Sequence, residues 1–129
     1  MHVEKYLKRL KAKRESNNFW LEINKDRLKP LLKHFKSLGV YRISSISGVD
    51  VGKNIEVIYH LIHKKNTINI RIKLNKNNPV LETITDIYPG ANLFERELYE
   101  MLGVEIQNHP NLKKLFLDEN SPKNPLRRN

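Results

Sequence analysis

The chain has 129 residues and contains no cysteine. Disulfides, thiolate nucleophiles and the usual cysteine-held zinc or iron–sulfur sites are therefore excluded. No apolar run approaches the roughly 18–20 residues that a membrane span requires. The first residues, Met1 to Lys5, lack the charged-then-apolar layout of a signal peptide. We therefore expect a single domain that stays in the cytoplasm and associates with a membrane only through partners.

Glycine and histidine are too scattered to form a recognisable catalytic constellation. The five glycines lie in separate turns, so no glycine-rich loop is present to cradle a phosphate. His60 and His63 face opposite sides of a predicted strand end and have no third metal ligand nearby. Glu105 and His109 resemble an acid/base pair, but no nucleophile accompanies them. The sequence thus predicts no catalytic residue, no bound cofactor and no metal on this chain.

The net charge of +10 is unevenly distributed. Residues 80–120 carry eight acidic and three basic side chains, so the positive charge belongs to the rest of the chain. A basic body of this kind suits nucleic acid, an anionic membrane surface or an acidic protein partner. A solvated lysine-rich surface without a partner accounts for it equally well.

Two stretches repeat apolar residues at the spacing of an amphipathic helix. They predict one helix over about residues 3–15 and another from near Asp26 to the stop at Gly39. Pro30 then falls close to the first turn of the second helix, where a missing N–H is tolerated. The apolar positions are Val3, Tyr6, Leu7 and Leu10, then Leu28, Leu31, Leu32, Phe35 and Leu38.

Strand patterns occupy the stretch between these helices and the middle of the chain. Ile68, Ile70, Ile72 and Leu74 alternate with polar residues, which is typical of a sheet with one face in water. The predicted strands cover residues 19–23, 41–47, 55–62 and 67–74. This order predicts an α+β fold, a two-layer sandwich with helices on one face of a small, mostly antiparallel sheet.

The polar run at residues 75–79 breaks this pattern. We expect a short helical stretch near residues 80–83, then a helix that Gly103 ends. Periodicity is lost beyond it, and the prolines predict an extended C-terminal arm that is mobile until it docks. We therefore divide the domain into a globular body, residues 1–90, and a helix with its docking arm, residues 91–129.

The most informative segment runs from about Thr85 to Asp118 and is called the 85–118 motif below. Asn92 and Glu95 have the spacing of a capping box at the start of its helix. The apolar stripe of this helix is Phe94, Leu98, Met101 and Leu102. The helical wheel points Arg96 and Glu100 away from the stripe as a surface pair, with Glu97 solvated.

The 85–118 motif resembles the 30 kDa subunit of respiratory complex I (NADH-quinone oxidoreductase) and its relatives in energy-converting, membrane-bound hydrogenases. The family pattern is Glu-Arg-Glu, an acidic residue, a glycine, and a His-Pro pair before basic and aliphatic residues. It is met here by Glu95, Arg96, Glu97, Glu100, Gly103, His109, Pro110, Lys113, Lys114 and Leu115. The terminal run from Pro125 to Arg128 is similar to the family's closing segment. Glu100, Leu102 and Asn108 depart from the usual residues, which leaves both quinone-reducing and hydrogenase-type complexes open.

The resemblance implies a non-catalytic subunit in the peripheral arm of an oxidoreductase complex on the cytoplasmic face of a membrane. Its partners would be a hydrogenase-like large subunit and a small iron–sulfur subunit, which would carry the iron–sulfur clusters. The residues that the resemblance assigns to partner binding are Glu95, Arg96, Glu97, Glu100, His109, Lys113, Lys114, Arg127 and Arg128.

The alternative from another class is a basic α+β module that binds nucleic acid. It would use the cations of the first helix together with Arg71 and Lys73 on the solvent face of a strand. Trp20 and the tyrosines are not spaced like a base-stacking platform, which argues against this alternative.

Overall fold

Short helices and strands alternate along the chain, and this computed structural model describes its residues 2–112 and 124–127. The N-terminal half contains α1 (Val3–Arg9), β1 (Lys13–Glu15), β2 (Asn18–Glu22), the 3-10 helix η1 (Lys25–Arg27), α2 (Leu28–Ser37) and β3 (Arg42–Asp50). The remainder contains β4 (Asn54–His63), β5 (Asn66–Asn75), β6 (Val80–Glu82), the 3-10 helix η2 (Pro89–Ala91), α3 (Asn92–Leu102) and β7 (Glu105–Gln107).

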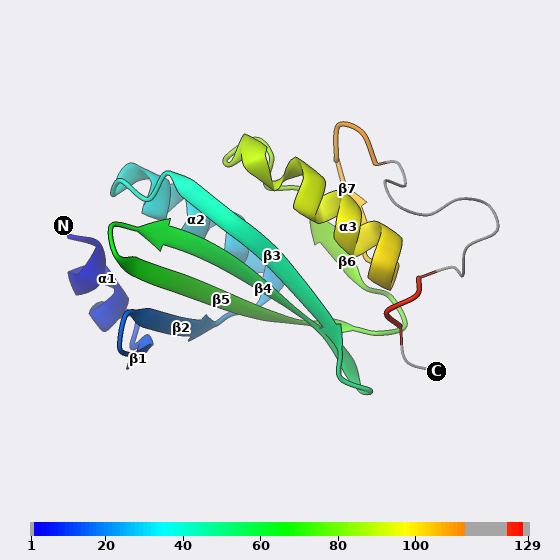
Figure 1. Cartoon of the computed structure of the whole chain (residues 1–129), viewed down its shortest axis with the longest axis horizontal. Helices are drawn as coiled ribbons and strands as arrows, with labels where there is room; N and C mark the ends of the chain where they lie inside the picture. Colours follow the sequence, from blue (N-terminus) through cyan, green and yellow to red (C-terminus); the bar gives the residue numbers. More distant parts are fainter. Residues whose placement is uncertain (1, 113–123, 128–129) are drawn as a thin grey trace.

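Five strands form one twisted sheet in the order β1-β2-β5-β4-β3 (Figure 1). Neighbouring strands are antiparallel except β2 and β5, which run parallel because α2, β3 and β4 intervene between them. A second, two-stranded sheet pairs β6 with β7 in parallel. The predicted α+β class, with a mostly antiparallel sheet, is confirmed.

The core lies on the inner face of the sheet, where alternate residues of the two central strands meet in register. Ile68, Ile70 and Ile72 of β5 lie opposite Leu61, Tyr59 and Val57 of β4, and all six are 0% exposed. Burying a large aliphatic side chain of this kind contributes about 1.5–3 kcal/mol to folding. The strict alternation of the sequence therefore dictates which face of the sheet is covered.

Helices α1 and α2 cover this inner face. The α2 helix buries Leu28, Leu32 and Phe35, and it lies behind β3 and β4 in Figure 1. The ring of Tyr6 packs edge-on against Phe35, with ring centroids 5.6 Å apart, so α1 is fixed to α2. Pro30 lies in the first turn of α2, as its missing N–H predicts.

The outer face of the sheet carries polar side chains that pair with one another. The Arg71 guanidinium lies 5.2 Å from the centre of the Trp20 ring, and its Nε is 3.3 Å from a Glu56 carboxylate oxygen. His60 hydrogen-bonds Ser47 at one ring nitrogen and Asn69 at the other, each at 2.7 Å. His60 is therefore part of a polar network within the sheet.

The α3 helix extends the helical layer beside β3, with β6 and β7 next to it (Figure 1). Gly48 permits this close approach, because a Cβ atom there would lie 2.6 Å from methyl groups of both Leu98 and Leu102. Gly103 ends α3 with a φ of 72°, the left-handed conformation that favours glycine. Over residues 2–112 and 124–127, no helix is long and apolar enough to cross a membrane.

Two local expectations were wrong. The first helix ends at Arg9 instead of continuing to residue 15, because its apolar spacing stops at Leu10 and Lys11 adopts a φ of 60°. Residues 13–15 form β1, which pairs with β2. Residues 80–82 form a strand instead of a helical turn, because they pair with residues 105–107.

We expected the arm to begin after Gly103 and to have few apolar anchors of its own. Val104 is instead 0% exposed and Ile106 is 3% exposed, and β7 pairs with β6. The first residues of the predicted arm therefore belong to the folded body.

Candidate functional site around α3

The first turn of α3 lacks the predicted capping box. The helix begins at Asn92 itself, and no side chain caps its N-terminus. Glu95 is 0% exposed and its carboxylate turns away from the helix backbone, toward the segment that follows β6. The motif's first acidic residue is therefore a buried connection between distant parts of the chain.

Glu95 accepts two hydrogen bonds from neighbouring residues after β6. The Thr83 hydroxyl donates to Oε1 at 2.6 Å, and the Ile84 backbone N–H donates to Oε2 at 2.9 Å. The two donors lie 11 and 12 residues before Glu95 in the sequence. We call this arrangement the Glu95 clip. It fixes α3 to the loop between β6 and η2.

His109 reaches the same place from the chain after β7. The Asn111 backbone N–H donates to His109 Nδ1 at 3.0 Å, so the ring proton sits on Nε2. Nε2 lies 3.2 Å from the Asn92 carbonyl oxygen, to which it donates, and 3.8 Å from Glu95 Oε1. In this orientation the His109 ring holds the start of the arm against the first turn of α3.

Burial dominates the electrostatics of the Glu95 clip. It raises the pKa of Glu95 above its ordinary value, although the hydrogen bonds from Thr83 and Ile84 oppose the rise. Burial also raises the pKa of the Tyr59 phenol, and the charge of Glu95 adds to that effect. The Tyr59 hydroxyl is buried without a hydrogen-bond partner among the described residues. The contacts of this cluster connect α3 to the segment after β6.

A second buried carboxylate lies at the other end of β3. Asp50 is 3% exposed, and its Oδ2 is 2.9 Å from Lys76 Nζ and 3.8 Å from Arg127 Nε. Arg127 also donates to the Leu102 carbonyl at 3.0 Å and to the Lys76 carbonyl at 2.8 Å. We call this arrangement the Asp50 clip. It joins β3, the chain after β5, the end of α3 and the C-terminal segment.

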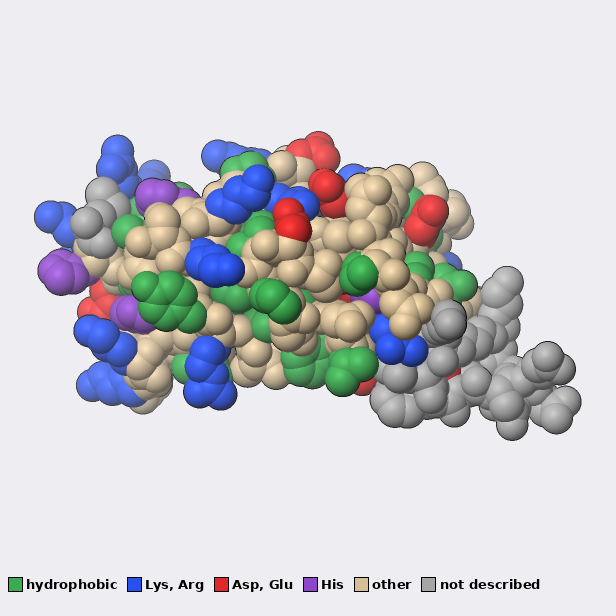
Figure 2. Space-filling model, turned by 90° about the horizontal axis from the view of Figure 1, so that it is seen from above, with side chains coloured by type: hydrophobic (Ala, Val, Ile, Leu, Met, Phe, Trp, Pro, Cys, Tyr) green, Lys and Arg blue, Asp and Glu red, His purple; other side chains and the backbone are tan. Residues whose placement is uncertain are grey.

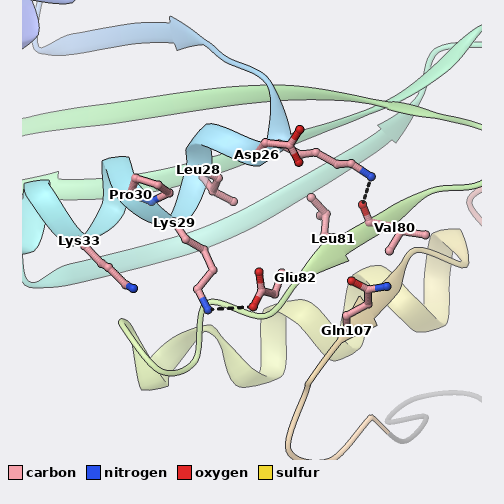
Figure 3. Close-up of a pocket in the computed structure, with 10 residues that line it drawn as sticks. Asp26, Leu28, Lys29, Pro30, Lys33, Val80, Leu81, Glu82 and Gln107 are labelled. Atoms are coloured by element: carbon pink, nitrogen blue, oxygen red, sulfur yellow. Dashed lines mark hydrogen bonds and ion pairs between the residues drawn. The ribbon is translucent and has the colours of Figure 1, made fainter.

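A groove with a volume of about 450 Å³ separates α2 from β6 (Figure 3). Lys29 reaches from α2 to Glu82 at 3.4 Å and to Asp86 at 3.0 Å, and Lys25 donates to the Val80 carbonyl at 3.4 Å. Partial desolvation would lower the pKa of Lys29, but the carboxylates of Glu82 and Asp86 outweigh it and raise this pKa. Lys29 in turn lowers the pKa of Asp86. The lysines thus bridge the groove and do not surround an anion site.

The structure separates the four charged residues of α3 that the resemblance assigns to partner binding. Glu95 and Glu100 are buried at 0% and 1% exposure, so the expectation that Glu100 points to solvent was wrong. Arg96 is half-buried and Glu97 is exposed. The helical wheel failed because α3 is flanked by β3 on one side and by β7 on another, so more than one stripe is covered.

The remaining predicted partner-binding residues fall into two groups. His109 and Arg127 contact the chain's own backbone, as described above. Lys113, Lys114 and Arg128 lie outside the described residues. Assignment of all of these side chains to a partner interface stays a prediction.

Sequence reasoning missed Thr83, Asp50 and Lys76. Thr83 belongs to no periodic pattern, and its role depends on Glu95, which is distant in sequence. Asp50 lies between the predicted strands 41–47 and 55–62, where an exposed Asp in a turn is ordinary. Only the fold brings each residue to its partner, so no local signal identifies them.

The described residues contain no group of three or more His, Asp or Glu side chains placed to hold a metal ion. The fold and the two clips define a helix-on-sheet α+β domain whose charged motif fastens its own elements together. The chain belongs to the family of the 30 kDa subunit of respiratory-chain NADH dehydrogenase, whose family model matches residues 21–129.

Two curated relatives and one solved structure illustrate the similarity. NADH-quinone oxidoreductase subunit 5 of Thermus thermophilus is 28% identical, covering 99% of this chain and 72% of that protein. A subunit of the F(420)H(2) dehydrogenase of Methanosarcina mazei is 34% identical, covering 75% of this chain and 65% of that protein. A chain of the membrane-bound sulfane sulfur reductase, an archaeal respiratory membrane complex, superposes with a TM-score of 0.82, 21% identity and coverage of 96% and 82%. This last likeness shows the shared fold.

Proposed function

We propose that the chain is a non-catalytic subunit of a complex I-like, membrane-bound oxidoreductase. The observation that carries the proposal is the family match over residues 21–129, which covers the sheet, α3 and the arm together. The relatives are named as subunits of an NADH-quinone oxidoreductase and of an F(420)H(2) dehydrogenase. Both complex types remain candidates for this chain.

The contribution of this subunit is to scaffold the hydrogenase-like large subunit and a small iron–sulfur subunit. The two clips support this role, because they fasten α3 and the C-terminal segment to the sheet body before any partner binds. A preorganised surface loses less conformational entropy on docking than a mobile one. The chain has no cysteine, so the iron–sulfur clusters of the complex would sit on those partners. The complex would place the chain on the cytoplasmic face of the membrane.

Deletion of the chain in its own cells, followed by native gel analysis of membranes, tests this role. We expect loss of the assembled complex and of its oxidoreductase activity, with both restored by the wild-type chain. Assembly at the normal level without the chain would contradict the proposal.

Arg96 provides a residue-level test of the proposed interface. Arginine is enriched at interface hot spots, and Arg96 is half-buried on α3 beside the exposed Glu97. We expect Arg96→Ala to shift the melting temperature of the free chain by no more than a few degrees but to reduce rescue of assembly. A large loss of melting temperature with Arg96→Ala would show that Arg96 serves the fold instead.

A further inference from the structure

The outer face of the sheet, opposite the layer that α2 forms (Figure 1), holds a serine, a histidine and an asparagine in one hydrogen-bonded chain. His60 of β4 and Asn69 of β5 are direct cross-strand partners. On its other side His60 lies opposite Ser45 of β3, and Ser47 follows Ser45 by two residues. Ser47 therefore faces His60 diagonally on the same face of the sheet. Three neighbouring strands each bring one polar side chain to this point.

The contacts of Asn69 fix which nitrogen of His60 carries the proton. The Asn69 amide nitrogen donates to the Phe19 carbonyl at 3.2 Å and to Asn18 Oδ1 at 3.4 Å, so the amide oxygen faces His60. An amide oxygen only accepts, and this one lies 2.7 Å from His60 Nδ1. The proton of the neutral ring is therefore on Nδ1, and Nε2 keeps a free lone pair.

Ser47 meets this lone pair. Its Oγ lies 2.7 Å from His60 Nε2, so the Ser47 hydroxyl donates to the ring. Asn69 is 3% exposed, which holds that end of the chain of contacts in place, whereas Ser47 is exposed and can be reached from solvent. A hydroxyl, an imidazole that can take its proton, and a third group that orients the imidazole are the parts of an activated nucleophile.

Two other exposed serines have a backbone carbonyl where Ser47 has an imidazole. The Ser44 hydroxyl donates to the His60 carbonyl at 3.1 Å, and the Ser37 hydroxyl donates to the His34 carbonyl at 2.6 Å. A backbone carbonyl is too weak a base to take up the proton of an attacking hydroxyl. Ser44 lies on the same strand as Ser47, so it is a matched control within the same molecule.

We propose that Ser47 is an acylation site that takes an acyl group from an activated ester or thioester, with His60 as its general base. Ser47 Oγ attacks the acyl carbon while its proton moves to His60 Nε2. The bond from the acyl carbon to the leaving oxygen or sulfur then breaks, and the leaving group takes the proton from Nε2. The products are an acyl ester on Ser47, a free alcohol or thiol, and neutral His60.

Asn69 is the positioning residue of this site, because its oxygen holds the Nδ1 proton and thereby leaves Nε2 free. The inference goes beyond the proposed function and does not rest on it. Acylation of Ser47 is one covalent modification of this chain, whereas the proposed function concerns the assembly of a complex.

Acetyl transfer from p-nitrophenyl acetate to the purified full chain tests the inference. Peptide mass spectrometry locates the acetyl group, and alkaline hydroxylamine removes acetyl esters of serine but leaves acetyl-lysine amides. We expect Ser47 to be acetylated at least about 100-fold faster than Ser44. Ser47→Ala should abolish the main hydroxylamine-sensitive acetyl group, whereas Ser44→Ala should leave it unchanged.

Variants of the other two residues test their separate roles. His60→Gln should slow the acetylation of Ser47 about 100-fold, because Gln can hydrogen-bond the hydroxyl but cannot take its proton. Asn69→Ala should slow it as well, and Asn69→Asp should restore it, because Asp keeps an acceptor for the Nδ1 proton. A merely structural role of Asn69 predicts the reverse order, since a buried carboxylate destabilises the sheet more than an alanine does.

Three results would overturn the inference. One is equal acetylation of Ser47 and Ser44, and another is an unchanged rate with His60→Gln at an unchanged melting temperature. The third is acetylation of His60 itself in Ser47→Ala at the rate at which the wild type forms its serine ester, which would make the imidazole the nucleophile. Loss of the complex on deletion of the chain is a separate measurement, so either proposal can fail while the other stands.

Discussion

At the scale of single residues, two buried carboxylates of this chain bind other parts of the same chain. Glu95 accepts hydrogen bonds from Thr83 and Ile84, and Asp50 faces Lys76 and Arg127. A buried carboxylate that loses these partners leaves an uncompensated charge, which costs more than the net value of the contacts. The acidic residues of the motif are therefore needed for the shape of the surface that a partner meets.

Glu95→Gln tests the electrostatics of the Glu95 clip. The folded-state pKa of Glu95 lies above its ordinary value of 4.5, so the folded chain binds this proton more tightly than the unfolded chain does. The resulting stability is fully present below about pH 4.5 and is lost as pH rises through the folded pKa. Gln cannot ionise and is close in shape to the protonated Glu side chain, so at low pH the variant should differ from the wild type by less than about 1 kcal/mol.

Thermal unfolding of both proteins between about pH 4 and pH 8 provides the measurement, because every other titrating group is shared. The stability of the wild type relative to Glu95→Gln should fall as pH rises. A wild type that gains stability relative to the variant as pH rises would mean that the pKa of Glu95 is depressed in the folded state, with the hydrogen bonds from Thr83 and Ile84 outweighing burial.

At the scale of elements, α3 depends on a glycine in the strand beneath it. Gly48→Ala would place a methyl group 2.6 Å from Leu98 and Leu102, which are 4% and 2% exposed and have little room to rotate. We expect a loss of about 1–2 kcal/mol in the free energy of unfolding. Gly90→Ala meets only an ordinary contact at 3.8 Å, so it should stay within about 0.5 kcal/mol. Urea unfolding of both variants measures this, and equal costs would contradict the packing described.

The C-terminal segment is likewise fastened by one residue. Arg127 donates to the carbonyls of Leu102 and Lys76, and it faces Asp50. Arg127→Ala should therefore lower the free energy of unfolding of the isolated chain by about 1–2 kcal/mol. Arg42→Ala, an exposed arginine on β3, serves as the control and should cost less than about 0.5 kcal/mol. No effect of Arg127→Ala in the free chain would mean that Arg127 serves only a partner.

Some elements of the fold can be predicted from the sequence, and others cannot. The long strands β4 and β5 follow from strict alternation, which depends only on neighbouring residues. The strands β1, β6 and β7 have three residues each, too few to show a period. β6 and β7 exist because they pair across the length of α3, so a local pattern cannot predict them.

The candidate site was only partly predicted from the sequence, because its contacts also join residues that are distant in the chain. The 85–118 motif identified Glu95 and the helix around it, but a capping box was the only partner that its local sequence offered. The true partners, Thr83 and Ile84, come from a segment with no periodic pattern. Motif residues are thus visible in the sequence, whereas their contacts depend on tertiary packing.

At the scale of the whole molecule, one end is rich in cations. Exposed lysines and arginines gather around α1 and the turn between β4 and β5, and blue side chains are frequent at that end in Figure 2. Such a basic end should bind duplex or single-stranded nucleic acid weakly and lose it between about 50 mM and 200 mM salt, because counterion release supplies the affinity. Fluorescence anisotropy at several salt concentrations measures this. A tight, salt-resistant and sequence-dependent complex would favour the nucleic-acid-binding alternative.

Native affinity purification of the tagged chain from its own cells, with identification of the partners and iron analysis, tests the assembly role most directly. The account predicts co-purification of a hydrogenase-like large subunit with iron–sulfur and membrane subunits, and iron in the purified material although the chain itself has no cysteine. Recovery of the bare chain without iron, or of nucleic acid and ribosomal proteins in place of these subunits, would contradict it.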